Sequence, residues 1–147
     1  MKTRAFGFNS RGEAATLYRF ENQNGMVMEV TDFGATLYSL QVPTSQGRLD
    51  VVLGYDDPAG YEGPSGTFFG ATVGRNANRI CKGEFTLKKK AYKLAVNNGP
   101  NNLHSGLDFY SFRIWQVKKT TETSTIVIST SASAISASAS TSFIYHF

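Results

Sequence analysis

The chain has 147 residues, of which 41% are hydrophobic and 13% aromatic, and its formal net charge is +4. This length fits one domain with a sizeable core. No segment approaches the roughly 18 apolar residues of a membrane-crossing helix, and no apolar run of signal-peptide length follows the charged N-terminus. We therefore expect a cytoplasmic protein with no membrane partner.

The positive charge does not indicate a nucleic-acid partner. Apart from Lys88–Lys90 and Lys118–Lys119 the cations are scattered, and no basic helix, stacking-platform motif or metal-finger spacing accompanies them. We expect Lys88–Lys90 to be a solvated hairpin tip. The lone Cys81 excludes an internal disulfide, and we expect its side chain to be a small buried group.

The first half of the chain consists of short apolar or alternating segments separated by turn residues, as is typical of antiparallel strands. The segment 21–25 reads as a hairpin turn because Asn and Gly tolerate positive φ. A further turn is expected at Ser45–Gly47 and a long loop at 56–66. The predicted strands are 15–20, 26–31, 36–42, 50–55 and 67–73.

The second half continues this pattern up to residue 117. Phe85 and Leu87 are placed to pair with Tyr92 and Leu94 across a lysine turn. No window shows a sustained helical period, so we expect an all-β antiparallel architecture. The predicted strands are 83–87, 91–96 and 111–117.

The composition changes abruptly after Val117. Of the last 30 residues 18 are Ser, Thr or Ala, which bury too little apolar area to offset the cost of ordering the backbone. We therefore divide the chain into 1–117 and a poorly ordered, low-complexity tail, 118–147, with one possible edge strand at Ile126–Ile128. A shifted reading frame, a mispredicted exon, an alternative splice end or a genuine disordered extension would each explain the change.

Two Gly-rich polar segments, 70–80 and 97–106, hold the candidate binding residues Asn78, Arg79 and His104. Arg79 is a permanent cation that can fork two donors onto sugar or carboxylate oxygens. His104 can donate or accept a proton near neutral pH. Together they predict a site for a polyol, although each alone would be an ordinary solvated loop residue.

Seven motifs in this order make residues 32–117 similar to the aldose 1-epimerase family, also called galactose mutarotases, with looser similarity before them. The motifs are Gly34-Ala-Thr, Asp50-Val-Val-Leu-Gly-Tyr-Asp-Asp, Gly60-Tyr, Phe69-Gly-Ala-Thr-Val-Gly-Arg-Asn-Ala-Asn-Arg-Ile, Lys82-Gly-Glu-Phe, Tyr92-Lys-Leu and Asn98-Gly-Pro-Asn-Asn-Leu-His-Ser-Gly.

The resemblance implies an antiparallel β-sandwich of the galactose mutarotase type. Its groove would bind a free hexose, glucose or galactose, and interconvert the α and β anomers without a metal or other cofactor. The family's sugar-contacting residues map onto Asn78, Arg79 and His104, and His104, near the reacting end of the sugar, is the candidate catalytic group. This chemistry needs an acid and a base on opposite sides of the substrate.

The chain departs from the family in its proton-transfer groups. The family's general acid is a second histidine, in an Asn-His-Ser-Tyr-Phe-Asn-Leu-like strand, and its general base is a glutamate near its C-terminus. Neither motif occurs here, and His146 has a different context. We therefore expect roughly the N-terminal half of a sandwich with little or no mutarotase activity. Phe69, Leu94 and Trp115 would lack packing partners, which could drive self-association through exposed sheet faces.

Two alternatives to a mutarotase remain. One is a non-catalytic hexose-binding module that keeps Asn78, Arg79 and His104. The other is a relative of the hexose-6-phosphate 1-epimerases, for which Arg75 could supply an extra cation. The sequence does not indicate which hexose is preferred.

Overall fold

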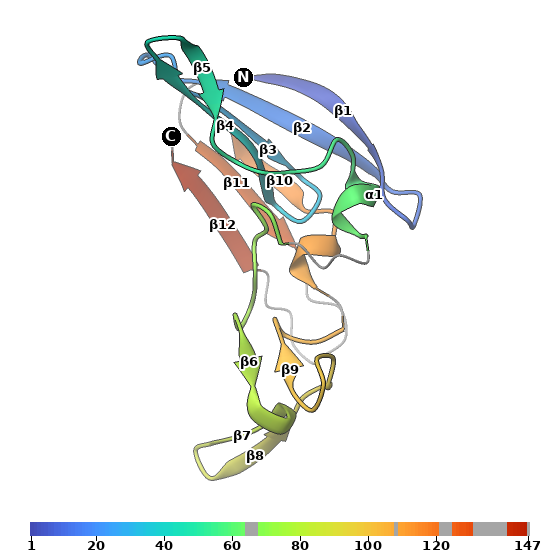
Figure 1. The fold of residues 1–147 in the computed structure, drawn as a ribbon. Helices are drawn as coiled ribbons and strands as arrows, with labels where there is room; N and C mark the ends of the chain where they lie inside the picture. The colour runs from blue at the N-terminus through green and yellow to red at the C-terminus, as the bar shows by residue number, and fades with distance from the viewer. Residues whose placement is uncertain (64–67, 108, 121–124, 131–140, 147) are drawn as a thin grey trace. The chain divides into compact units, whose positions relative to one another are not determined.

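A computed structural model of the chain describes residues 1–63, 68–107, 109–120, 125–130 and 141–146, and side chains as far as Lys118. These residues form mainly antiparallel strands (Figure 1), so the predicted all-β class is confirmed. Among them no helix is long and apolar enough to cross a membrane. By its internal contacts the chain divides into two compact units: unit 1 comprises Met1–Thr72 and Ser111–Phe147, and unit 2 comprises Val73–Tyr110.

Unit 1 contains a five-stranded antiparallel sheet in which each strand pairs with its neighbour in the sequence. The strands predicted at 15–20, 26–31 and 36–42 are confirmed as β2, β3 and β4. Sequence reasoning misses β1 because Phe6 is its one buried side chain, so the strand shows no alternation. The strands are β1 Lys2–Phe8, β2 Ala14–Glu21, β3 Val27–Thr31, β4 Thr36–Thr44 and β5 Gly47–Asp50.

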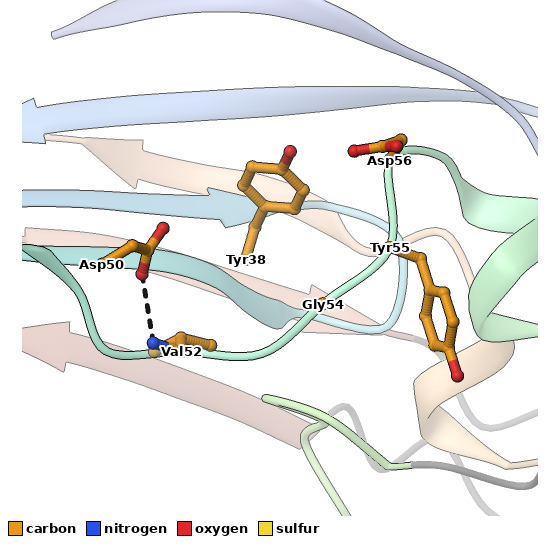
Figure 2. A pocket seen from close by; sticks show the side chains of 6 residues that line it. All are labelled: Tyr38, Asp50, Val52, Gly54, Tyr55 and Asp56. Atoms are coloured by element: carbon orange, nitrogen blue, oxygen red, sulfur yellow. Dashed lines mark hydrogen bonds between the residues drawn. The ribbon is translucent and has the colours of Figure 1, made fainter.

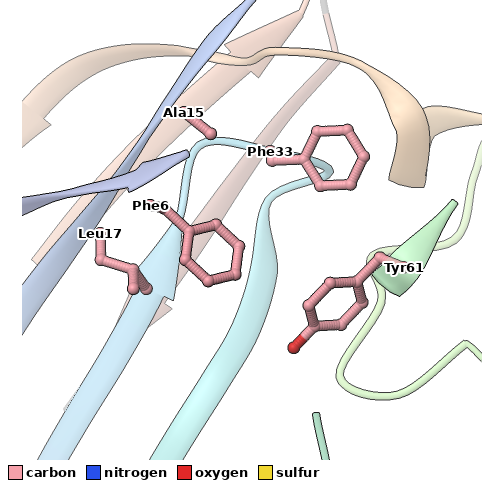
Figure 3. Close-up of a cluster of buried hydrophobic side chains, with 5 residues drawn as sticks. All are labelled: Phe6, Ala15, Leu17, Phe33 and Tyr61. Carbon is pink, nitrogen blue, oxygen red and sulfur yellow. The ribbon is translucent and has the colours of Figure 1, made fainter. Parts of the chain in front are cut away.

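Buried side chains from the sheet and its connections form a core cluster (Figure 3). Its Phe and Leu side chains each contribute roughly 1.5–3 kcal/mol when fully buried. Tyr61 comes from the one-turn helix α1 (Pro58–Tyr61). Asp57 caps α1, because its side chain accepts the N–H of Gly60 at 2.9 Å. The members of the cluster are Phe6, Ala15, Leu17, Phe33 and Tyr61.

Residues 111–115 pair with the connection between β3 and β4. The N–H of Gly34 donates to the carbonyl of Arg113 at 2.7 Å, and the N–H of Trp115 donates to the carbonyl of Asp32 at 2.8 Å. The Trp115 side chain is only 1% exposed. This pairing therefore adds a chain segment distant in sequence to the core of unit 1.

The expectation that Phe69 and Trp115 lack packing partners is wrong. Trp115 is among the most buried side chains described, and Phe69 packs against the core cluster with its ring centroid 5.8 Å from that of Tyr55. Leu94 is half-buried. The described side chains therefore give no support for self-association driven by these residues.

The strand predicted at 50–55 is wrong beyond its first residue, because β5 ends at Asp50. The Asp50 carboxylate accepts hydrogen bonds from the N–H groups of Leu40 and Val52, both at 3.1 Å, and from the Ser39 hydroxyl at 2.6 Å. A side chain that takes up the N–H two residues ahead turns the backbone out of the strand.

The strand predicted at 67–73 is wrong over residues 68–73, while Thr67 lies outside the described residues. Gly70 has a φ of +58°, a left-handed conformation that interrupts an extended chain. Its carbonyl accepts the N–H of Leu37 at 2.9 Å, so the segment still touches the start of β4.

A second antiparallel sheet has the strand order β10-β11-β12. The strand predicted at 111–117 is wrong over its first five residues, because the 3-10 turn η2 (Tyr110–Phe112) and the pairing with the β3–β4 connection occupy them. The possible strand at Ile126–Ile128 is confirmed within β11, but its predicted edge position is wrong, because β11 pairs with both β10 and β12. The remaining tail residues 121–124, 131–140 and 147 lie outside the described residues, so their expected disorder stays a prediction. The strands are β10 Gln116–Thr120, β11 Thr125–Thr130 and β12 Thr141–His146.

Unit 2 contains two small strand pairs, β6 with β9 and β7 with β8. The predicted hairpin is confirmed by β7 and β8, in which the rings of Phe85 and Tyr92 stack at 5.0 Å. Leu87 lies opposite Lys90 rather than Leu94, because a two-residue loop with positive φ sets the register. The elements are β6 Arg79–Ile80, η1 Cys81–Gly83, β7 Glu84–Leu87, β8 Lys90–Lys93 and β9 Asn102–Leu103.

Two expectations about side chains of unit 2 have opposite outcomes. Lys88–Lys90 is exposed at the hairpin tip, as predicted. Cys81 is also exposed, so the prediction of a buried thiol is wrong. Cys81 begins the turn η1, where the chain leaves β6.

The pairing of Gly34 gives a test of the core. Gly34 has a φ of +69°, and a Cβ there would overlap the Ser111 backbone. Gly12 has a φ of +75° with nothing within 4 Å of an added Cβ. Gly12→Ala should therefore cost only the left-handed strain of about 1–2 kcal/mol. Gly34→Ala should cost about 1–3 kcal/mol more, because of the overlap. Equilibrium urea unfolding measures both, and equal losses would contradict the observed packing.

Candidate functional site

The pairing of β6 with β9 brings the two predicted site segments together. Arg79 lies opposite Leu103 and Ile80 opposite Asn102. One step beyond this ladder, the His104 N–H donates to the Asn78 carbonyl at 3.1 Å. The Asn78 N–H in return donates to the His104 ring nitrogen Nδ1 at 3.0 Å. All three residues predicted from sequence therefore lie in one place.

The backbone at this place is held in an unusual conformation. Asn78 has a φ of 62° and His104 a φ of 51°, a left-handed region that non-glycine residues enter rarely, although Asn and His do so more often than most. The neighbouring Ser105 braces it, because its hydroxyl accepts the N–H of Asn76 at 2.9 Å and lies 3.2 Å from the Asn76 carbonyl.

The contact with Asn78 fixes the protonation pattern of His104. Since Nδ1 accepts a hydrogen bond, the proton of the neutral ring is on Nε2, and Nε2–H is a donor. Burial lowers the pKa of His104 from its ordinary value, and the nearby Arg79 cation lowers it further. Near neutral pH the imidazole is therefore an uncharged donor. Its ring centroid lies 6.4 Å from that of Phe109, in an edge-to-face arrangement.

Arg79 is exposed but its guanidinium is held by two carboxamides. Nε donates to Asn98 Oδ1 at 2.8 Å, and an Nη1 hydrogen donates to Asn78 Oδ1 at 3.3 Å. Among the described side chains no carboxylate forms an ion pair with Arg79. The site therefore combines an oriented cation with a neutral imidazole donor.

Sequence reasoning misses the carboxamides that shape the second segment. The Asn97 side chain donates to the carbonyls of Leu103 and Gly106 at 3.0 and 2.9 Å and accepts the N–H of Leu103 at 2.6 Å. Asn102, only 1% exposed, donates to Ala95 O at 2.7 Å. The abundance of Asn in 97–102 is the available signal, but composition alone does not separate framework residues from ligand contacts.

A cavity in unit 1 holds none of the predicted site residues (Figure 2). Its volume is about 180 Å³. Hydrogen bonds to Ser39 and to backbone N–H groups hold the Asp50 carboxylate, and they lower its pKa although burial alone would raise it. Tyr38 packs edge-on against Phe6, and Tyr55 against Tyr61. The cavity is lined by Tyr38, Asp50, Val52, Gly54, Tyr55 and Asp56.

Metal ligands do not gather in the part of the chain that the structure describes. No three His, Cys, Asp or Glu side chains there are placed to hold an ion together. What unit 2 offers a ligand is a set of hydrogen-bond donors, from a guanidinium and an imidazole, which suits oxygen acceptors.

Comparison with known proteins gives one consistent relationship. A family model described as aldose 1-epimerase matches residues 16–146. Galactose mutarotase of Bos taurus is 46% identical over 104 residues, which are 69% of this chain and 30% of that protein. Aldose 1-epimerase of Escherichia coli (strain K12) is 36% identical over 107 residues, which are 72% of this chain and 31% of that protein. The family match extends beyond the motifs of 32–117 on both sides.

Solved structures agree with the fold. A GalM/aldose epimerase homologue from C. elegans has a TM-score of 0.71 and 32% identity, over 81% of this chain and 36% of that one. Galactose 1-epimerase from Lactobacillus acidophilus NCFM has a TM-score of 0.67 and 24% identity, over 88% of this chain and 37% of that one. The predicted galactose mutarotase type of β fold is therefore confirmed, and the chain spans about a third of such structures.

The proximity of Arg79 to His104 is testable in solution. Replacing Arg79 by Met removes the cation, so the pKa of His104 should rise toward its ordinary value, though not fully, because burial remains. Histidine Cε1–H signals followed by NMR against pH measure this, with Lys89→Met as a control for lost charge. An unchanged His104 pKa in Arg79→Met would contradict the arrangement.

The lowered pKa of His104 also sets a pH dependence of stability. A folded-state pKa below the unfolded value means that the unfolded chain binds the proton more readily. The contribution of His104 is therefore fully present above the ordinary pKa near 6.5 and is lost as the pH falls through the folded pKa. The difference in urea midpoint between the native chain and His104→Gln should shrink over that window. A difference that grows with falling pH would contradict the assigned direction.

Proposed function

The chain belongs to the aldose 1-epimerase family, and from this we propose that unit 2 carries the hexose-binding part of a mutarotase site. The observation that carries the proposal is the reciprocal hydrogen bonding of Asn78 and His104. It sets the imidazole of His104 beside the guanidinium of Arg79 within one small unit. The ligand is a free aldohexose such as glucose or galactose.

Each of the two groups has a defined part in binding. Arg79 donates from its Nη atoms to hydroxyl oxygens of the sugar, while Nε and one Nη1 hydrogen stay on the carboxamides of Asn98 and Asn78. His104 donates through Nε2–H to an oxygen near the anomeric centre. Asn78 contributes through its backbone, by fixing the imidazole, more than through its own side chain.

The reaction of the family needs more than these donors. A base removes the proton of the anomeric hydroxyl while an acid protonates the ring oxygen, the ring opens to the aldehyde, and rotation about C1–C2 allows closure to the other anomer. A neutral His104 with a lowered pKa is a poor acid, and one imidazole cannot act at both positions. We propose that His104 orients and polarises the sugar and that this chain by itself is catalytically incomplete.

Sugar binding is the first test. Calorimetric titration with galactose and glucose should give saturable binding, and Arg79→Gln should weaken it about 10-fold or more, since a hydrogen bond from a charged group is worth about 1.5–3 kcal/mol. Lys89→Gln, which removes a charge from the exposed hairpin tip, should leave the Kd unchanged. Tighter binding of glucose 6-phosphate than of glucose would favour the hexose-phosphate branch. No saturable binding of any of them would reject the proposed site.

Turnover is a separate test. The optical rotation of freshly dissolved α-D-glucose should relax at the rate of the buffer blank when this chain is added. The reason is that a single hydrogen-bond donor cannot supply both the acid and the base that the reaction needs. Aldose 1-epimerase of E. coli is the positive control. Relaxation clearly faster than the blank, and abolished by His104→Gln, would show that the chain is a complete mutarotase.

A further inference from the structure

Two hydrogen bonds of different length hold the Arg79 guanidinium. The bond from Nε to Asn98 Oδ1 is short, at 2.8 Å, whereas the bond from Nη1 to the adjacent Asn78 is 3.3 Å. Nε lies at the root of the guanidinium plane, so a bond there restrains the plane while the Nη hydrogens not bonded to Asn78 remain available as donors. Asn98 therefore has the stronger control over the direction of the donors.

The backbone of Asn98 is itself pinned. Its N–H donates to the carbonyl of Asn101 at 3.1 Å, and the Asn101 N–H donates back to the Asn98 carbonyl at 3.0 Å. Gly99, with a φ of 55°, makes the tight turn between them possible. A rigid turn thus carries the acceptor to Arg79, across 19 positions in the sequence.

The acceptor is neutral, and this matters for a ligand without charge. A carboxylate at the same place would fix the guanidinium equally well but would compensate its charge. A carboxamide fixes the direction of the fork and leaves the full positive charge for the ligand oxygens and for the field that lowers the pKa of His104. Because the side chain is ordered beforehand, less conformational entropy is lost on binding.

We propose that Asn98 is the positioning residue of the site: its carboxamide oxygen orients the Arg79 guanidinium toward the sugar without neutralising it. The inference rests on the proposed hexose site. Its first consequence is that the Arg79 side chain is ordered in the protein without sugar, and this can be measured in the absence of any ligand. Asn101 provides a matched control in the same turn, since its side chain accepts the N–H of Lys82 at 3.2 Å rather than a bond from Arg79.

The first arm follows the Arg79 Nε–H signal in 15N NMR spectra of the whole chain, assigned from its loss in Arg79→Lys. Asn98→Ala and the near-isosteric Asn98→Leu should speed the exchange of this hydrogen with water about 10-fold or more. Asn98→Asp, which keeps the acceptor, and Asn101→Ala should leave the exchange slow. Both Asn98→Ala and Asn98→Leu remove the acceptor, so the test still works if one of the two variants fails to fold. Circular dichroism identifies a variant that does not fold.

The second arm measures the charge. In Asn98→Asp the new carboxylate offsets the Arg79 cation, so the pKa of His104 should rise although the Nε–H stays protected. Unchanged Nε–H exchange in both Asn98→Ala and Asn98→Leu would overturn the positioning role. An unchanged His104 pKa in Asn98→Asp would overturn the claim that neutrality of the acceptor matters.

The third arm is galactose affinity. Asn98→Ala should weaken binding several-fold, and Asn98→Ala combined with Arg79→Gln should be no weaker than Arg79→Gln alone, because Asn98 acts through Arg79. If the losses of galactose affinity in the two single variants added up in the double variant, Asn98 would not act through Arg79. Absence of galactose binding by the native chain would reject the proposed function, while the Nε–H and pKa arms would still decide whether Asn98 orients Arg79.

Discussion

The reciprocal hydrogen bonds between Asn78 and His104 are the constraint on which the site depends. They extend the two-residue pairing of β6 with β9 and hold both residues in left-handed backbone conformations. A pairing this short would be weak alone. The Asn97 side chain and the Ser105 hydroxyl add bonds on either side of it, so that polar side chains, rather than a hydrophobic core, define the geometry of these loops.

The electrostatics of the site follow from the same bonds. Because Nδ1 of His104 accepts a hydrogen bond, the remaining nitrogen of the neutral ring, Nε2, is a donor. The Arg79 cation helps to keep the ring neutral, because it lowers the pKa of His104. Arg79 is held by carboxamides, so its charge remains available. The result is a pair of directed donors suited to the oxygens of a polyol.

Sequence patterns predict the parts of the fold that obey regular periodicity, namely β2, β3, β4 and the β7–β8 hairpin. They fail where one side chain or one glycine overrides the local preference, as Asp50 does in ending β5 and Gly70 does in interrupting the following segment. The burial of Trp115 depends on pairing with a distant loop, which no local pattern encodes. At the site, the motifs predict Asn78, Arg79 and His104 as binding residues, but they do not reveal the contact between Asn98 and Arg79, which appears only in the structure.

The central claim is that this chain binds a hexose through unit 2. Amide and side-chain shift mapping by 15N NMR during titration with D-galactose tests it most directly. If unit 2 binds the sugar, saturable shifts are expected at Asn78, Arg79 and His104, with the signals of Leu17 and Val30 in the core sheet unchanged. Shifts confined to the β1–β5 sheet, or no shifts at saturating sugar, would contradict it.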